Sequence, residues 1–241
     1  MMSDRNRAPK RRTPAQRQDR TRKGRQQEIT PDSPWRLFLA VPLPIDVRDR
    51  VRAIVARLEE TDLPARWIDP DNGHLTLHFI GETEPEMAEL LRMALPAPIT
   101  SHAPFELRTA EPGTFPSIRR PRVLWLGLWG PAYRLEALYN DIGDFLDDFG
   151  LEIEDAPFHP HITLGRIRDT EGVKVSELPI SVRDVFEDLT DDGLVGADAA
   201  VPFPVTEVQL IRSHLEQQGP RYEVLATYRL QGDADLKSPR W

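Results

Sequence analysis

The sequence predicts an α+β protein built from two packed lobes, with helices on the outside of the sheets. Strand-like and helix-like segments alternate from Trp35 onward, and two long segments carry hydrophobic residues at helical spacing. A similar succession of elements then returns in the second half of the chain. The 241 residues suffice for one large domain or two small lobes. Cysteine is absent, which excludes disulfides, thiolate metal ligands and a cysteine nucleophile.

Each expected element rests on periodicity and on turn residues at its ends. In the first half we expect strands at 35–41 and 74–80 and helices at 45–60 and 84–94. In the second half we expect strands at 105–109, 122–128 and 161–167, a helix at 131–149, and a closing hairpin of 205–213 with 222–230. The acidic stretch 168–203 is expected to be rich in loops, with one helix near 181–189.

The charge is distributed unevenly over three predicted segments. Residues 1–33 hold 10 Lys and Arg against 4 Asp and Glu, whereas the rest of the chain holds 21 against 35. Because this first segment has almost no large apolar residues, we expect a disordered basic tail, which offers a possible contact to RNA. The domain proper is expected at 34–231, followed by a C-terminal tail at 232–241.

The chain shows neither an apolar run of the roughly 18 residues that span a bilayer nor the apolar core of a secretory signal. We therefore expect a cytoplasmic monomer with no membrane contact.

One short pattern occurs twice in expected strands. His74-Leu75-Thr76-Leu77 and His161-Ile162-Thr163-Leu164 both read as His-x-Thr-hydrophobic, and they stand 87 residues apart. Because successive strand side chains alternate between faces, the histidine and threonine of each copy share one face. If the lobes face each other, two His-Thr pairs meet across one cleft.

This set of residues suits hydrolysis of a phosphodiester. One imidazole can take a proton from the attacking water and the other can give one to the departing ribose oxygen, since the histidine pKa of about 6.5 makes both forms accessible. The hydroxyls of Thr76 and Thr163 can donate hydrogen bonds to the phosphate oxygens, where negative charge accumulates. No metal is needed for these steps.

Other roles are open to the histidines. A single His-x-Thr pattern arises by chance in many strands, and a metal site is the main rival, because His74 and His78 could share a strand face and His159 and His161 form a His-x-His pair. No further ligand is clearly placed, so we expect no metal. His102 and His214 are treated as surface or packing residues.

The paired motif and its surroundings resemble the two-histidine (2H) phosphoesterase superfamily, in its branch of RNA 2′,3′-cyclic phosphodiesterases, also described as 2′-5′ RNA ligases. The resemblance covers roughly residues 35–231. The segments that carry it are Arg36–Pro44, Arg66–Ile68, Gly73–Glu82, Pro121–Gly127, Phe158–Arg166, Ser213–Leu215 and Gly219–Tyr222.

The resemblance implies a bilobal two-histidine phosphoesterase fold, with two pseudo-symmetric lobes of antiparallel-rich sheet and outer helices around a central cleft. It implies hydrolysis of an RNA or nucleotide 2′,3′-cyclic phosphate to a 2′-phosphomonoester, with no metal or other cofactor. By the resemblance, His74 is the proton donor, His161 is the proton acceptor, and Thr76 and Thr163 hold the phosphate. The spacing alone does not fix which histidine has which role.

Three further residues are candidates for substrate binding. Arg166 faces away from His161 if the strand alternation continues through Gly165, which leaves its part in the site open. Arg122 is a candidate phosphate contact and Phe38 a candidate for base stacking, and surface charge and core packing are their alternatives.

Two other functions remain open. The same site could join RNA ends through 2′-5′ bonds, although water at high concentration favours hydrolysis. A non-catalytic module that binds RNA ends would instead show tight, salt-sensitive binding without turnover.

Overall fold

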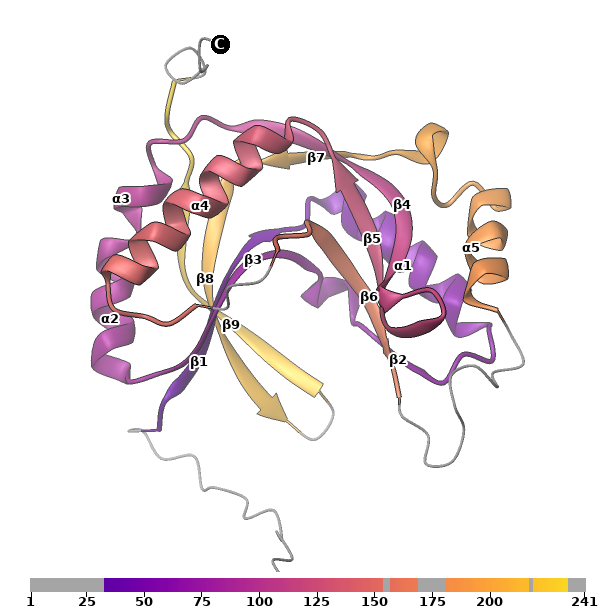
Figure 1. Ribbon diagram of the computed structural model, residues 1–241, viewed down its shortest axis with the longest axis horizontal. Coiled ribbons are helices and arrows are strands. Elements are labelled where there is room, and N and C mark those ends of the chain that lie inside the picture. Colours follow the sequence, from indigo (N-terminus) through magenta and orange to yellow (C-terminus); the bar gives the residue numbers. More distant parts are fainter. Residues whose placement is uncertain (1–32, 154–156, 169–180, 217–218, 234–241) are drawn as a thin grey trace, which may run out of the picture. The chain divides into compact units, whose positions relative to one another are not determined.

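Among the described residues, nine strands form one antiparallel sheet in this computed structural model (Figure 1). The structure describes residues 33–153, 157–168, 181–216 and 219–233, which belong to one compact unit, Asp32–Trp241. The expected tails at 1–33 and 232–241 therefore lie almost entirely outside the described residues. The strands are β1 (Trp35–Pro42), β2 (Ala65–Trp67), β3 (His74–Thr83), β4 (Phe105–Ser117), β5 (Arg120–Trp129), β6 (His161–Ile167), β7 (Pro202–Val205), β8 (Glu207–Glu216) and β9 (Gly219–Arg229).

Two halves meet at the centre of this sheet. The strand order is β7-β4-β5-β6-β3-β1-β8-β9, with β2 paired to β6. The central strands β3 and β6 share a single register pair, Leu75 opposite Ile162. The two predicted lobes are thus confirmed, but they share one continuous sheet that is joined at its middle by one pair of residues.

Helices cover one face of the sheet and cross between the lobes. They are α1 (Ile45–Glu59), α2 (Pro85–Ala94), α3 (Pro96–Ile99), α4 (Ala132–Asp148) and α5 (Val182–Asp191), with single 3₁₀ turns at Pro70–Asn72 and Ala197–Ala199. Helix α1 follows β1 but packs near β7 and α5 of the other lobe, and α4 follows β5 but packs near β3 and α3 (Figure 1). This exchange ties the lobes together.

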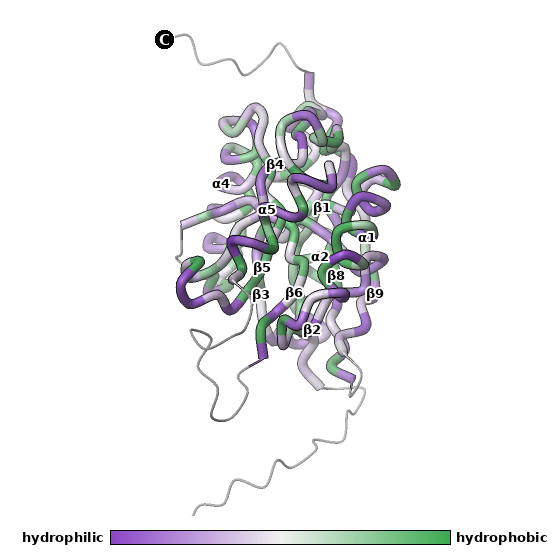
Figure 2. Tube along the Cα trace, turned by 90° about the vertical axis from the view of Figure 1, so that its right-hand side faces the viewer, coloured by the Kyte–Doolittle hydropathy of each residue, from purple (hydrophilic) through white to green (hydrophobic). Residues whose placement is uncertain are grey.

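The predicted apolar helix faces form the core. On α1 the buried side chains recur at helical spacing and are Val47, Val51, Ile54, Val55 and Leu58. Figure 2 shows hydrophobic and hydrophilic residues alternating along the same helices, as one buried face and one solvated face require. No helix in the described part of the chain is long and apolar enough to cross a membrane.

Two short strands were not expected. β7 begins at the end of the stretch 168–203 that we expected to be rich in loops, and it contains Pro202 and Pro204. It pairs with β4 at the edge of the sheet, where a strand can contain proline because one side makes no ladder bonds. β2 has only three residues, too few to show a periodicity. The helix expected near 181–189 is confirmed as α5.

Candidate active site

The two motif copies lie on the two central strands and point to the same side of the sheet. Leu75 and Ile162, which pair across β3 and β6, are both fully buried among the helices. Because side chains alternate, their neighbours point to the opposite face, and the antiparallel register places His74 beside Thr163 and Thr76 beside His161. We call this surface, which carries both histidines and both threonines, the open face.

Both imidazoles are held by the same kind of hydrogen bond. The Nδ1 atom of His74 lies 2.8 Å from the carbonyl oxygen of Asn72, and that of His161 lies 2.7 Å from the carbonyl oxygen of His159. A carbonyl can only accept, so in each ring Nδ1 carries the hydrogen. The tautomer is thereby fixed, and Nε2 of each histidine is left for proton transfer.

The surroundings lower the pKa of both histidines. Burial lowers the pKa of His74, the hydrogen bond to Asn72 opposes this, and the charge of His161 lowers it further. Burial also lowers the pKa of His161, the bond to the His159 carbonyl opposes it, and the charges of Arg166 and His159 add to the lowering. Both rings therefore favour the neutral form, and each Nε2 is a proton acceptor until an anion approaches.

Aromatic rings pack against His74. The ring centre of Phe38 lies 4.9 Å from that of His74, and the Tyr222 ring stands edge-on at 5.4 Å. Phe38 is only 3 % exposed, so it forms a floor under His74 and offers little free surface to a base. Tyr222 comes from β9 and completes this side of the site.

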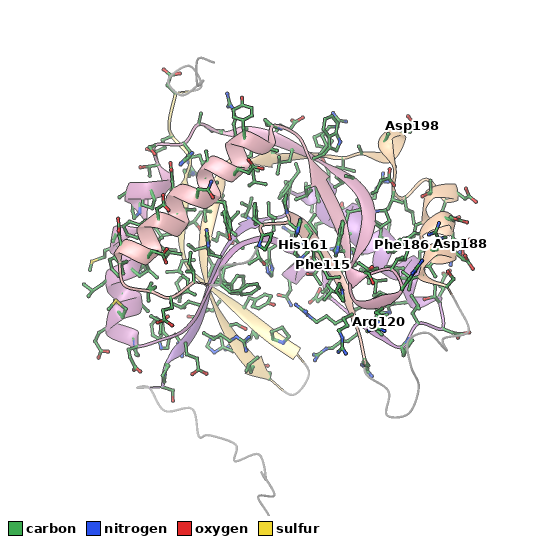
Figure 3. All side chains as sticks on the ribbon, in the orientation of Figure 1. Phe115, Arg120, His161, Phe186, Asp188 and Asp198 are labelled. Atoms are coloured by element: carbon green, nitrogen blue, oxygen red, sulfur yellow. The ribbon has the colours of Figure 1, made fainter. Side chains whose placement is uncertain are left out.

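A different pair of rings packs against His161. Phe115 lies beside His161 (Figure 3) and stands edge-on to it, with ring centres 5.0 Å apart. The ring centre of Trp125 lies 6.2 Å from that of His161. Phe115 belongs to β4 and Trp125 to β5, so three adjacent strands hold this imidazole in place.

Both central strands contain a bulge at the same motif position. Along β3, Thr76 pairs with Ala40 and His78 with Leu39, so Leu77 is an extra residue. Along β6, Leu164 is likewise extra, because Thr163 and Gly165 pair with consecutive residues of β5. A bulge reverses the alternation beyond it, so each strand carries its later side chains to the face opposite to the expected one.

The first bulge overturns the expectation that His78 shares a face with His74. His78 is buried, its Nε2 lies 2.8 Å from the carbonyl oxygen of Tyr139, and its ring stacks on Tyr139 of α4. It therefore points to the helices, so the face-sharing premise of the rival metal site was wrong. No group of three or more metal-binding side chains occurs among the described residues.

The second bulge changes the position of Arg166. Strict alternation placed it on the far face, but the reversal at Leu164 brings it to the open face. The charge of Arg166 lowers the pKa of His161. Burial raises the pKa of Tyr222, and the charge of Arg166 partly offsets that rise. Arg166 therefore lies near both rings. The structure thus brings Arg166 to the histidines.

The remaining predicted residues lie as follows. Arg122 is an exposed residue at a bulge of β5, next to Val123, which pairs with Arg166. His102 is buried, with Nε2 2.9 Å from Asp141, and His214 lies 2.7 Å from Glu223. These two contacts agree with the packing and surface roles expected for His102 and His214.

Several residues beside the site carry no signal in the sequence. Tyr222, Phe115 and Trp125 come from strands whose partners are fixed only by the sheet order, so no local pattern marks them. In the sequence, Arg66 stands out only as part of the segment Arg66–Ile68. It pairs directly with Arg166 on β2, and a Cβ at Gly219 of the β8–β9 hairpin would overlap its guanidinium.

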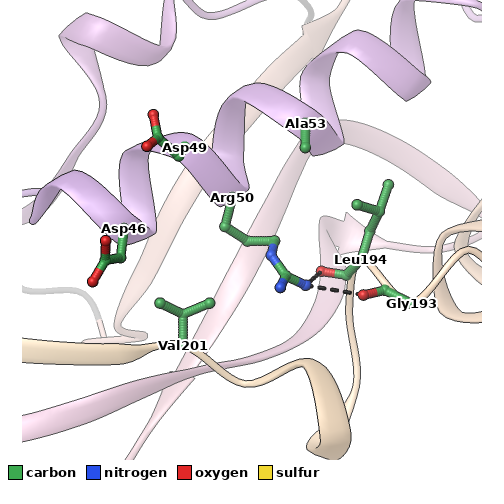
Figure 4. A pocket seen from close by; sticks show the side chains of 7 residues that line it. All are labelled: Asp46, Asp49, Arg50, Ala53, Gly193, Leu194 and Val201. Carbon is green, nitrogen blue, oxygen red and sulfur yellow. Dashed lines mark hydrogen bonds between the residues drawn. The ribbon is translucent and has the colours of Figure 1, made fainter.

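A separate hollow lies away from this chemistry. Its volume is about 440 Å³, and Arg50 of α1 donates hydrogen bonds in it to the carbonyl oxygens of Gly193 and Leu194 (Figure 4). None of the predicted site residues lines it, so this hollow is separate from the histidine site.

Two histidines and two threonines on adjacent central strands define a two-histidine phosphoesterase. The family model described as LigT-like phosphoesterase matches residues 41–125 and 130–222. The chain belongs to this family.

Several known proteins are similar to the chain. An RNA 2′,3′-cyclic phosphodiesterase of Aeropyrum pernix is 33% identical over 71% of this chain and 92% of its own length. One of Methanothermobacter thermautotrophicus is 30% identical over 81% and 98%. Among solved structures, Escherichia coli LigT complexed with 3′-AMP has a TM-score of 0.59 at 30% identity, covering 82% of this chain and 98% of LigT. The protein TT0787 of Thermus thermophilus has a TM-score of 0.58 at 28% identity, with 82% and 99% covered.

Proposed function

We propose that the protein hydrolyses RNA 2′,3′-cyclic phosphate ends to 2′-phosphomonoesters by acid–base catalysis between His74 and His161, without a metal. The observation that carries this proposal is the matched pair of Nδ1–carbonyl hydrogen bonds, which leaves one Nε2 on each central strand. The relatives named RNA 2′,3′-cyclic phosphodiesterase support the substrate class.

The reaction needs one proton acceptor and one proton donor. The His161 Nε2 takes a proton from a water molecule, whose oxygen then bonds to phosphorus. The bond from phosphorus to the ribose O3′ breaks, and the protonated Nε2 of His74 gives its proton to that oxygen. The product is a 2′-phosphomonoester with a free 3′-hydroxyl.

The proton donor must be charged before the step, although burial favours its neutral form. The cyclic phosphate is an anion, and an anion near an imidazole raises the imidazole pKa. Binding of the substrate between the rings therefore helps to load the proton on His74. His161 keeps the neighbouring positive charge of Arg166, which favours the neutral, accepting form.

The groups beside the histidines stabilise the phosphate. The hydroxyls of Thr76 and Thr163 donate hydrogen bonds to its non-bridging oxygens, where charge grows in the transition state. The guanidinium of Arg166 adds a positive charge on the open face. Arg66 pairs directly with Arg166 across the strands, which puts a second arginine on the same face.

The test is turnover of an oligonucleotide that ends in a 2′,3′-cyclic phosphate, in the presence of a chelator, with identification of the product. A 2′-phosphate product is expected, together with a bell-shaped dependence of kcat/KM on pH. A 3′-phosphate product would mean that O2′ leaves, and binding without turnover would leave only the recognition of RNA ends.

A further inference from the structure

A row of apolar side chains crosses the open face from the histidines to the edge of the sheet. Phe79 of β3 pairs with Phe38 of β1, Phe38 pairs with Ile211 of β8, and Ile211 pairs with Val224 of β9. Directly opposed residues on adjacent strands point to the same face. We call Phe79, Phe38, Ile211 and Val224 the apolar row.

The two ends of the apolar row are open to solvent. Phe79 is 55% exposed and Val224 is 52% exposed, whereas Phe38 and Ile211 are buried between them. The Phe79 position follows from the bulge at Leu77, because unbroken alternation would have turned this ring toward the helices. The exposed ring of Phe79 therefore rests on a buried apolar base that includes Phe38 and Ile211.

The apolar row is continuous with the proposed catalytic centre. The Phe38 ring centre lies 4.9 Å from that of His74 and 6.1 Å from that of Phe79. Two ring-to-ring steps therefore lead from the His74 imidazole to Phe79, the first ending at Phe38 and the second at Phe79. Tyr222 lies beside the first step, because its ring centre is 5.4 Å from that of His74.

We propose that the exposed face of Phe79, supported by the rest of the apolar row, binds the nucleobase that precedes the terminal nucleotide of the RNA. This inference rests on the proposed function. With the cyclic phosphate between the histidines, the terminal ribose and its base stay at the first step, beside Tyr222. The chain leaves that ribose only through O5′, so the preceding nucleotide is the next group to reach the second step.

The surroundings favour a nucleic-acid strand as the occupant. Bases stack on exposed aromatic rings, and their linking phosphates bind to cations nearby. Arg166 and Arg66 supply such cations on the open face, and the charge of Arg36 also reaches Tyr222. Apolar rings with arginines beside them match the alternation of base and phosphate along single-stranded RNA.

The test compares two substrates in the full chain, adenosine 2′,3′-cyclic phosphate and a trinucleotide with the same end. Phe79→Ala is expected to lower kcat/KM about tenfold for the trinucleotide and less than twofold for the mononucleotide. Phe79→Trp should retain trinucleotide turnover. Tyr133→Ala is the matched control, because Tyr133 is 53% exposed on the outer helix α4.

A third substrate identifies the base. In this substrate an abasic ribose replaces the penultimate nucleotide of the trinucleotide. The kcat/KM of the wild type should then fall about tenfold, as it does in Phe79→Ala on the intact trinucleotide. The kcat/KM of Phe79→Ala should fall almost no further on the abasic substrate. The inference would be overturned if Phe79→Ala lost the same factor in kcat/KM on both intact substrates. It would also be overturned if the losses in kcat/KM from the variant and from the abasic site were additive. If the wild type turns over neither substrate, the proposed function fails, and the same comparison is made by the binding affinity of a trinucleotide that ends in 3′-phosphate.

Discussion

The strands β3 and β6 begin alike and end differently. Each carries His-x-Thr-Leu, each holds the histidine Nδ1 against the carbonyl two residues earlier, and each bulges at the fourth motif position. The fold thus holds a histidine in the same way twice. Because the strands run antiparallel with one register pair between the motifs, the two groups come to lie side by side.

The difference begins directly after the bulges. The sixth position is Phe79 in β3 and Arg166 in β6, and both side chains return to the open face. The strand next to β3 contributes Ala40 opposite Thr76, whereas the strand next to β6 contributes Trp125 opposite Thr163. The repeated part supplies the proposed acid–base pair, and the unequal part makes one wall apolar and the other cationic.

The largest expected effect tests whether the two halves form one catalytic unit. His74→Ala and His161→Ala should each lower kcat about 10²- to 10⁴-fold on a nucleoside 2′,3′-cyclic phosphate, since each removes one partner of the proton transfer. The double variant should be little slower than either single variant, because the residues act together. Circular dichroism checks that the variants fold. A variant that retains full activity would show that its half is not part of the mechanism.

Arg166 distinguishes the two halves by charge. Arg166→Met should raise KM about tenfold through loss of a phosphate contact. It should also raise the pKa of His161, because the arginine charge lowers it. If His161 is the base, the acid limb of kcat/KM against pH moves to higher pH, so activity falls more at pH 6 than at pH 8.

The control for this experiment is Arg183→Met, on the exposed surface of α5. Neither pH limb should move in that variant. A shift of the basic limb in Arg166→Met, with the acid limb unchanged, would assign the proton-donor role to His161 and reverse the proposed order.

The threonines test the equivalence of the two halves more finely. Thr76→Val and Thr163→Val remove a hydroxyl that donates to the phosphate, and each should lower kcat about tenfold. Serine at either position keeps the hydroxyl and should restore most of the activity. Unequal losses, measured under single-turnover conditions, would show that one strand holds more of the transition-state charge than the other.

The motif residues were predictable because their geometry is local. An alternating strand fixes that His74 and Thr76 share a face, and a second copy implies a partner. The bulges were not predictable, since nothing in the letters Leu77-His78 or Leu164-Gly165 marks an extra residue. That single feature decided the positions of His78, Phe79 and Arg166.

In the fold, too, long periodic elements were predictable from the sequence and short edge strands were not. The helices α1 and α4 were predicted closely because their apolar faces repeat over four or more turns. The strands β2 and β7 were missed because three or four residues at an edge carry no period and tolerate proline. The exchange of helices between lobes depends on which surfaces fit one another, and no local pattern reports it.

The residues at the bulges give a test of packing. In β6, Gly165 lies under the Trp67 ring, and a Cβ there would overlap it. Gly165→Ala should therefore lower the free energy of unfolding by about 1–3 kcal/mol. In β3 the matching position is His78, which packs on Gly143 of α4.

Gly143→Ala is the control for that prediction, because its Cβ would lie 3.2 Å from His78 and alanine favours the helix. It should change stability by less than about 1 kcal/mol. Chemical denaturation of both variants compares the two bulges. Equal losses would show that Trp67 moves aside and that the glycine in β6 is not required by packing.

The smallest expected effect is the contribution of His78, in β3, to the pH dependence of the unfolding free energy. Burial lowers the pKa of His78, so the folded state holds this ring neutral while the unfolded chain takes up a proton below about pH 6.5. The stability from this group is complete above that pH and is lost as the pH falls toward the folded pKa. The β6 half has glycine at the matching position and lacks this contribution. His78→Phe keeps the stack on Tyr139 and should show a smaller loss of unfolding free energy between pH 8 and pH 5.5 than the wild type, whereas an identical loss would place the titrating group elsewhere.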